Sequence, residues 1–254
     1  MIKSWAGALA GLLVSAAAWA GNCPAYYVDG RLPEIKNPKL AVATRELCYG
    51  VFGVVHSGVT RTPLWSAEFL KPEQIEQAQQ LSRENNFHAE PRLPPRERAE
   101  LADYARSGFD RGHMSPNGDM PDRASQRDSF ALANIVPQNG ENNRHLWSAI
   151  EQATRKLAKR DGGLYVLTGP AYLEARVQKV GNVLVPSHLY KAVYSPKQKA
   201  GAAWFVRNEA TEEFEVMNIA QLEDKIGINL MPSLSPQQKT VMLALPTLKL
   251  RKKK

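Results

Sequence analysis

The feature that most constrains the fold of this chain is a long amphipathic stretch over residues 141–159. Its apolar residues Leu146, Ile150, Ala153 and Leu157 recur at helical spacing, so they form one stripe along a predicted helix. Such a stripe has to be buried against a second layer of structure. A chain of 254 residues, 43% of them hydrophobic, is long enough to supply that layer within one globular domain.

The other predicted elements are strands and helices in mixed order. Apolar, β-branched runs predict strands at residues 47–56, 63–70, 129–136, 164–168, 183–185, 189–195 and 202–207. Helices are predicted at 73–82, 96–104 and 218–226, and a loop at 83–95. Strict β-α-β alternation and linker-like stretches are both missing from the sequence. We therefore expect an α+β fold in a single domain with a largely antiparallel sheet.

The first twenty residues have the pattern of a signal peptide. Lys3 gives a short positive region, residues 6–17 are uncharged and apolar, and Ala18-Trp19-Ala20 offers a small-x-small cleavage site. The apolar run is too short for a spanning helix. We therefore predict a signal peptide at residues 1–20, a periplasmic or extracellular location, and no membrane attachment after cleavage.

Two cysteines, Cys23 and Cys48, follow this segment. They allow one intramolecular pairing, which an oxidising compartment favours. Closing that loop would stabilise the fold by about 3–4 kcal/mol. The predicted organisation is therefore an N-terminal arm at 21–46 tied by a disulfide, a catalytic domain at 47–236, and a C-terminal extension at 237–254 with a basic tail.

The net charge of the chain is +8, from 33 Lys and Arg against 25 Asp and Glu. A positive surplus suits a polyanionic partner such as nucleic acid, because neutralising phosphates releases condensed counterions. Charge alone is a weak signal, since many basic proteins never contact nucleic acid.

The segment over residues 107–120 carries the clearest sign of chemistry. It holds few residues able to build a core, and its three glycines make the backbone permissive. His113 lies within this segment, three residues after Asp110 and two after Arg111. A histidine in such a setting suits a general base or a metal ligand. The alternative is a turn histidine that bonds to the backbone.

A row of polar residues is predicted along the helix over 141–159. Asn143, Trp147, Glu151 and Arg155 are each four positions apart, so they would lie beside the apolar stripe on one face. An amide oxygen, a carboxylate and a guanidinium could serve a divalent ion, water and a phosphate. The alternatives are a helix-capping asparagine and an exposed ion pair between Glu151 and Arg155.

These motifs resemble those of the DNA/RNA non-specific endonucleases, the family of the Serratia nuclease and endonuclease G type. The resemblance rests on D-R-G-H at 110–113, N-I-V-P-Q at 134–138, and the N-x₇-E-x₃-R spacing from Asn143 to Arg155. Thr168-Gly169-Pro170, Val185-Pro186 and Tyr190-Lys191 belong to it as well. It covers residues 47–234, most of the chain.

The resemblance implies a ββα-metal core and a role for seven residues. His113 would be the general base, and Asn143 the only direct protein ligand of Mg²⁺, for which Mn²⁺ could substitute. Glu151 would hold the water around the ion. Arg83 and Arg155 would contact phosphate. Arg111 and Asn134 would shape the site. Asn139 and Asn142 compete with Asn143 for the metal, and the family spacing to Glu151 favours Asn143.

The expected function is that of a secreted, magnesium-dependent endonuclease that cuts both DNA and RNA and leaves 5′-phosphate ends. The partner would be the phosphate backbone of either nucleic acid, and a homodimer is left open. Activity should fall once acid protonates His113. Two alternatives remain: a nucleic-acid-binding protein that has lost its activity, and a phosphodiesterase for small or lipid phosphates.

Overall fold

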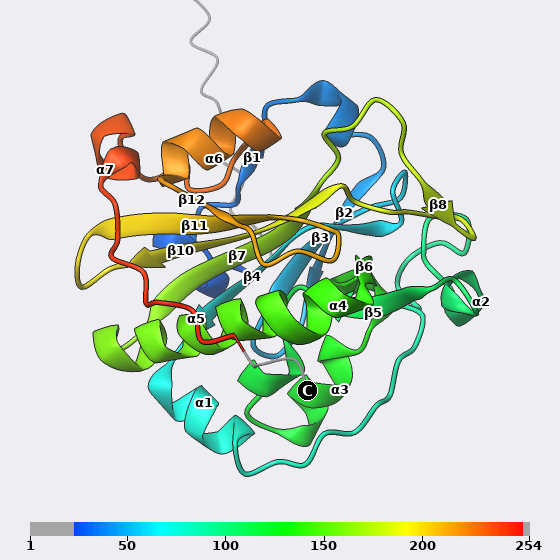
Figure 1. Ribbon diagram of the computed structural model, residues 1–254, viewed down its shortest axis with the longest axis horizontal. Coiled ribbons are helices and arrows are strands. Elements are labelled where there is room, and N and C mark those ends of the chain that lie inside the picture. Colours follow the sequence, from blue (N-terminus) through cyan, green and yellow to red (C-terminus); the bar gives the residue numbers. More distant parts are fainter. Residues whose placement is uncertain (1–22, 251–254) are drawn as a thin grey trace, which may run out of the picture.

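The computed structural model describes residues 23–250, and a seven-stranded sheet runs through its centre (Figure 1). All neighbouring strands are antiparallel, in the order β12-β11-β10-β7-β4-β3-β2. The strands are β2 (Thr44–Cys48), β3 (Gly53–Ser57), β4 (Thr62–Leu70), β7 (Leu164–Ala171), β10 (His188–Ser195), β11 (Ala200–Arg207) and β12 (Glu215–Met217). The predicted α+β class with a largely antiparallel sheet is confirmed.

Helices cover both faces of this sheet. The amphipathic helix α6 (Ile219–Ile226) packs on one face through Ile219 and Leu222, and α5 (Ser148–Asp161) packs on the other (Figure 1). Because each face meets a helix layer, β4 is buried along nearly its whole length. That double coverage explains why the central strands are continuous apolar runs in the sequence.

A ββα unit lies below the sheet as drawn in Figure 1. Strand β5 (Phe109–His113) pairs antiparallel with β6 (Ile135–Asn139). The chain then enters a helix made of α4 (Gly140–Asn142), a π-helical turn over Asn143–Trp147, and α5. The four apolar residues of the predicted stripe are all buried in one core cluster with the sheet. The long helix predicted at 141–159 is confirmed.

The remaining elements are short. They are the helices α1 (Pro72–Ala78), α2 (Leu101–Tyr104), α3 (Arg123–Ser129) and α7 (Pro236–Thr240), the two-stranded pairs β1 (Glu34–Ile35) with β13 (Ile228–Asn229) and β8 (Lys179–Val180) with β9 (Val183–Leu184), and 3₁₀ turns at Pro24–Tyr26, Val28–Gly30, Pro38–Leu40, Asn117–Asp119 and Leu132–Asn134.

Three predicted elements are wrong in their extent. The strand expected at 47–56 is two strands, because a turn closed by the Tyr49 N–H to the Phe52 carbonyl separates β2 from β3. The strand expected at 129–136 begins only at Ile135, because the Asn134 amide donates back to the Ser129 carbonyl and holds a turn there. The helix expected at 96–104 is α2 alone, which begins after Glu100.

The disulfide predicted between Cys23 and Cys48 is present, with 5.7 Å between the two Cα atoms. It ties the N-terminal arm to β2. At the other end, residues beyond α7 stay against the body of the protein: Leu243 is buried, and Leu245, Leu248 and Leu250 pack on the core under α5. The predicted signal peptide and the last four residues lie outside the described residues. Within residues 23–250, no helix is long and apolar enough to cross a membrane.

Candidate active site

The β5–β6 hairpin fixes the position of His113. His113 is the last residue of β5 and lies opposite Ile135 of β6. The preceding residue has to be glycine, because a Cβ atom on Gly112 would overlap the side chain of Gln138. The glycine of the D-R-G-H motif therefore allows the close approach of the two strands that places His113 at the hairpin end.

His113 is 7% exposed and packs between two aromatic rings. Its ring meets Phe130 edge-on with 4.8 Å between centroids, and Phe87 lies 5.4 Å away. The Arg83 guanidinium lies over the Phe130 ring, 5.1 Å from its centroid, and the Arg111 guanidinium lies over the Phe87 ring at 4.3 Å. Burial, together with these two positive charges, lowers the pKa of His113 from 6.5 to about 3.

The Nε2 atom of His113 is buried and has no hydrogen-bond partner within the described residues. A buried polar atom is costly in a native fold unless a water molecule, an ion or a ligand supplies its hydrogen bond. With its pKa lowered, the imidazole is neutral near pH 7. A neutral ring with one free nitrogen can accept a proton from a molecule that enters the cleft.

A cleft of about 280 Å³ opens beside His113. Five of the seven predicted site residues line it: Arg83, Arg111, His113, Asn143 and Glu151. Other residues on its walls, which the predicted set does not include, are Asn117, Arg144 and Ser148. A second hollow of about 670 Å³ shares Arg83, Arg111, Asn143 and Arg144 with the first. Together they form an open, basic depression.

The helix side of the cleft presents oxygen atoms. The Asn143 amide nitrogen donates to an Asp110 carboxylate oxygen at 3.0 Å, which leaves its carbonyl oxygen as the atom available to a metal ion. Arg144 holds the same carboxylate with two bonds of 3.0 and 2.6 Å. Asn142 points the other way: it is buried, accepts from Gln138 and donates to the Arg207 carbonyl. Of the two asparagines, Asn143 is the one that faces the cleft.

The predicted row of Asn143, Trp147, Glu151 and Arg155 is interrupted. The π-helical turn over Asn143–Trp147 changes the spacing at the start of the helix, because a π turn closes over five residues instead of four. Trp147 is fully buried, and Ser148 lies on the cleft wall between Asn143 and Glu151 instead. The expectation that all four residues share one face is therefore wrong.

Arg155 is not on the cleft wall. Its Nη1 donates to Asp119 at 2.7 Å, and Asp119 is 2% exposed. The backbone at Gly118 covers the guanidinium so closely that a Cβ atom there would lie 3.0 Å from Nη1. In this structure Arg155 supports the turn that carries Asn117, so the predicted phosphate contact would need this turn to move.

Asn134 is also outside the cleft. Its carbonyl accepts from the Ser115 N–H at 2.9 Å, and its amide donates to the Ser115 carbonyl at 2.8 Å. The side chain is fully buried. Asn134 thus holds the segment that follows His113 in place, and its role in shaping the active site stays a prediction.

Buried charges underlie the cleft and were not among the predicted site residues. Glu68 of β4 and Lys191 of β10 are each 1% exposed. Lys191 donates to the Thr168 hydroxyl at 2.6 Å and lies 5.4 Å from the Trp147 ring centroid. Burial raises the pKa of Glu68, and burial also raises that of Glu151. Glu68 is the one charged residue in the apolar run 63–70. That isolated charge was the sequence signal that could have identified it as a buried functional residue.

The donor set fits a hard cation. Asn143 and Glu151 offer oxygen atoms on the helix side, and the Asn117 Oδ1 atom is buried without a hydrogen-bond partner in the described part of the chain. Magnesium prefers oxygen ligands and keeps several of its waters. An open cleft with few protein ligands suits that preference.

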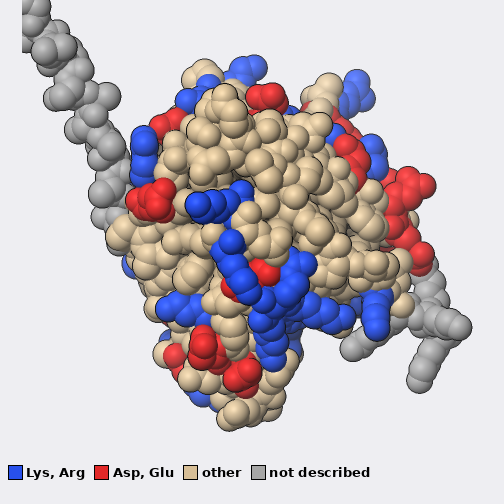
Figure 2. All heavy atoms as spheres, turned by 90° about the vertical axis from the view of Figure 1, so that its left-hand side faces the viewer, with Lys and Arg blue, Asp and Glu red and all other residues tan. Residues whose placement is uncertain are grey.

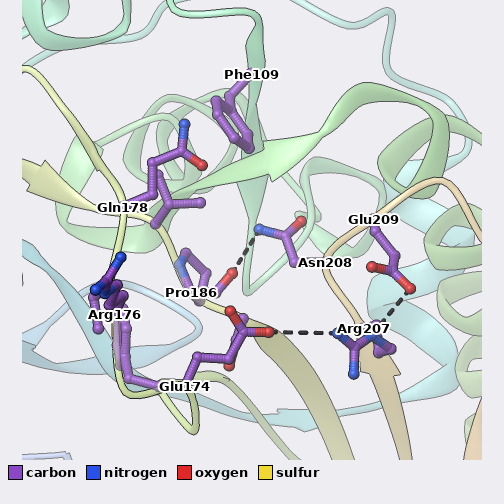
Figure 3. Close-up of a pocket in the computed structure, with 12 residues that line it drawn as sticks. Phe109, Glu174, Arg176, Gln178, Pro186, Arg207, Asn208 and Glu209 are labelled. Atoms are coloured by element: carbon purple, nitrogen blue, oxygen red, sulfur yellow. Dashed lines mark hydrogen bonds and ion pairs between the residues drawn. The ribbon is translucent and has the colours of Figure 1, made fainter.

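A further hollow of about 190 Å³ lies on the other side of β5 (Figure 3). Its charges are largely neutralised: Arg207 pairs with Glu174 at 3.4 Å and with Glu209 at 3.0 Å. Asn208 donates to the Pro186 carbonyl at 2.9 Å. None of the seven predicted site residues lines this hollow, so the chemistry is assigned to the cleft at His113.

Comparisons with known proteins agree on one family. The family model for DNA/RNA non-specific endonucleases matches residues 34–237. Nuclease C1 of Cunninghamella echinulata var. echinulata is 34% identical over 168 residues, covering 60% of this chain and 67% of that protein. The mitochondrial nuclease EXOG of Danio rerio is 31% identical over 201 residues, covering 70% and 58%. The mitochondrial nuclease of Saccharomyces cerevisiae is 31% identical over 213 residues, covering 72% and 64%.

A solved nuclease structure is similar to this chain in fold. The crystal structure of the EndoG/EndoGI complex, which concerns EndoG inhibition, superposes with a TM-score of 0.71 at 25% identity and covers 78% of this chain and 89% of that one. This likeness supports the predicted ββα-metal nuclease fold. The matched regions span about 58–67% of the length of the three relatives.

These names correct one expectation. The periplasmic or extracellular location predicted from the first twenty residues is contradicted, because relatives from fish, yeast, human and cattle are named mitochondrial nucleases. The expected endonuclease class is supported by the same comparisons. With the family model matching most of its length and the motif geometry in place, this chain belongs to the DNA/RNA non-specific endonuclease family.

Proposed function

We propose that the protein is an Mg²⁺-dependent endonuclease that hydrolyses the phosphodiester bonds of both DNA and RNA and leaves 5′-phosphate ends, with Mn²⁺ able to substitute. One observation carries the proposal. His113, whose buried Nε2 atom has no hydrogen-bond partner within residues 23–250, lines the same cleft as Asn143 and Glu151, with Arg83 and Arg111 on its walls. A neutral base, oxygen donors and two cations are the groups that hydrolysis of a phosphodiester requires.

Each group has a distinct task. His113 accepts a proton from the attacking water, and its aromatic neighbours hold the ring in place. The hydroxide attacks phosphorus opposite the 3′ oxygen, and the bond between phosphorus and that oxygen breaks. The phosphate stays on the 5′ oxygen of the downstream nucleotide, and the 3′ oxygen takes a proton from solvent to leave as a hydroxyl. Arg83 and Arg111 stabilise the negative charge that builds on the phosphate.

Asn143 and Glu151 would hold the metal ion, with Asp110 fixing the orientation of the Asn143 amide. When bound, the ion supplies charge neutralisation at the scissile phosphate and at the leaving oxygen. Glu151 is suited to accept hydrogen bonds from the water around the ion, since it lines the cleft together with Asn143. Its raised pKa would return toward the ordinary value once a cation is present.

The substrate range follows from what these residues address. The arginines and the metal site recognise phosphate, and phosphate contacts position a protein without reading bases. No residue that we assign to the substrate senses the 2′ hydroxyl, which is the group that distinguishes RNA from DNA. We therefore expect nearly sequence-independent cleavage of both nucleic acids. The homodimer left open by the sequence stays a prediction.

Digestion of supercoiled plasmid and of a structured RNA tests the proposal. Wild-type protein should cut both in Mg²⁺ and neither in EDTA, and the ends should be ligatable at their 5′ phosphates without kinase treatment. Binding without cleavage would support the alternative of an inactive nucleic-acid-binding protein. Preferential hydrolysis of a small phosphodiester over DNA would support the other alternative.

A further inference from the structure

A group of exposed lysines surrounds the end of α5 that is remote from the cleft. Three segments meet there: the last turns of α5, the turn between β10 and β11, and residues 244–250. Gln198 in that turn donates to both carboxylate oxygens of Asp161 at 2.8 Å, and Arg160 donates to the Ala244 carbonyl at 3.3 Å. These two contacts bring the segments together on one side of the molecule.

Five lysines on these segments form what we name the α5-end patch: Lys156, Lys159, Lys197, Lys199 and Lys249. All are exposed, and none has an acidic partner within residues 23–250. The acid among them, Asp161, is buried and already paired with Arg160 at 2.8 Å. Figure 2 faces this side of the molecule and shows Lys and Arg gathered across its centre.

Helix geometry relates the patch to the cleft. Ser148 lies on the cleft wall, and Lys159 follows it by eleven residues along α5. Eleven residues are close to three full turns of an α-helix, so both side chains leave the same side of α5, about 16 Å apart along its axis. The patch therefore continues the direction of the cleft instead of lying on an unrelated face.

We infer that the α5-end patch binds the phosphate backbone of the substrate beyond the cut site. This inference rests on the proposed function. At 3.4 Å per nucleotide along a duplex strand, 16 Å corresponds to about five nucleotides. Lysine acts as a mobile point charge without geometric demands, so the patch would hold any nucleic acid and would add affinity without adding sequence preference. Each contact would release condensed counterions and steepen the salt dependence of binding.

Loss of the α5-end patch should weaken the binding of long substrates and leave that of short ones unchanged. The double variant Lys159→Glu/Lys197→Glu alters the patch and leaves all cleft residues in place. Lys36→Glu/Lys39→Glu is the control, because it reverses two exposed lysines of the N-terminal arm with the same change in net charge. Unlike the patch variant, it also removes one exposed ion pair, between Lys36 and Glu34 at 2.9 Å. Steady-state cleavage of a duplex of several hundred base pairs and of one about six base pairs long is measured for both variants in Mg²⁺.

On the long duplex, the patch variant should show KM raised about three- to tenfold at low salt, with kcat unchanged. Its log–log dependence of binding on salt should be shallower by about two, one unit for each lost phosphate contact. On the short duplex, and for the control variant on either substrate, KM should stay at the wild-type value.

Three results would overturn the inference. Equal KM values for patch and control variants would show that these lysines do not contact the substrate, and the proposed function would stand. Equal losses on long and short duplexes would show that the substitution disturbs the cleft itself. If the wild-type protein cuts neither duplex, the proposed function fails and the inference with it. Thermal unfolding of all three proteins checks that each is folded.

Discussion

The two sides of the cleft differ in chemistry. On the hairpin side, His113 is surrounded by aromatic rings and by the charges of Arg83 and Arg111, which keep the imidazole neutral. On the helix side, Asn143 and Glu151 present oxygen atoms that suit a cation. A base and a metal site need opposite environments, since positive surroundings favour the neutral imidazole and repel an ion. The protein brings them into one cleft, with the base on β5 and the oxygen atoms on the helix that follows β6.

Asp110 connects the two sides. It lies on β5 three residues before His113, and it accepts from Asn143 and Arg144 on the helix. The D-R-G-H motif thus contains the proposed base and the carboxylate that orients the amide proposed to bind the metal. Charge-assisted bonds of this kind are stronger than neutral ones, so Asp110 also fixes the distance between the hairpin and the helix.

The largest expected effect tests the hairpin side alone. His113→Ala should reduce kcat by about 10²–10⁴-fold, because the substitution removes the general base. The Mg²⁺ concentration for half-maximal rate should change little, since the residues on the helix side remain. Plasmid cleavage measured across a range of Mg²⁺ gives both quantities. A rate within about tenfold of wild type would remove His113 from the mechanism.

The sequence predicted the regular parts of the molecule well. The long helix and α6 were visible because their apolar side chains follow the helical period, and the central strands because they are continuous apolar, β-branched runs. Five predicted residues line the cleft: Arg111, His113, Asn143 and Glu151 were predicted from the motifs, and Arg83 only as a position that the family resemblance implied. Glu68 and Asp119 were missed, since their importance arises from tertiary burial beneath the cleft. The π turn was missed as well, because periodicity in a single sequence assumes regular helical turns.

A smaller effect tests the helix side. Asn143→Ala should raise the Mg²⁺ needed for half-maximal rate by about 10–100-fold, while leaving DNA binding in EDTA nearly unchanged. Asn142→Ala is the matched control on the neighbouring residue. It removes buried hydrogen bonds to Gln138 and the Arg207 carbonyl, so it should lower the melting temperature without shifting the metal requirement. The reverse pattern would place the metal ligand one residue earlier and break the assignment of the two sides.

The smallest effect concerns the neutral imidazole. The pKa of His113 falls from 6.5 to about 3 on folding. Between these two pH values, the imidazole is protonated in the unfolded chain and neutral in the folded protein. The free energy of unfolding should therefore decrease as pH drops through this window, by at most about 1.4 kcal/mol per pH unit from this residue. Above pH 6.5, His113 is neutral in both the folded and the unfolded chain, so the free energy of unfolding no longer changes with pH because of this residue.

Urea unfolding of wild type and His113→Asn at several pH values between 4 and 7 measures that contribution, since carboxylates and His56 act equally in both proteins and cancel in the difference. The wild-type curve should fall more steeply toward acid. The same low pKa implies that His113 stays unprotonated at pH 5, so the loss of activity expected on mild acidification should not arise from this residue. Parallel stability curves would mean that His113 titrates alike in the folded and unfolded chain, and the hairpin side would then lack the environment that distinguishes it from the helix side.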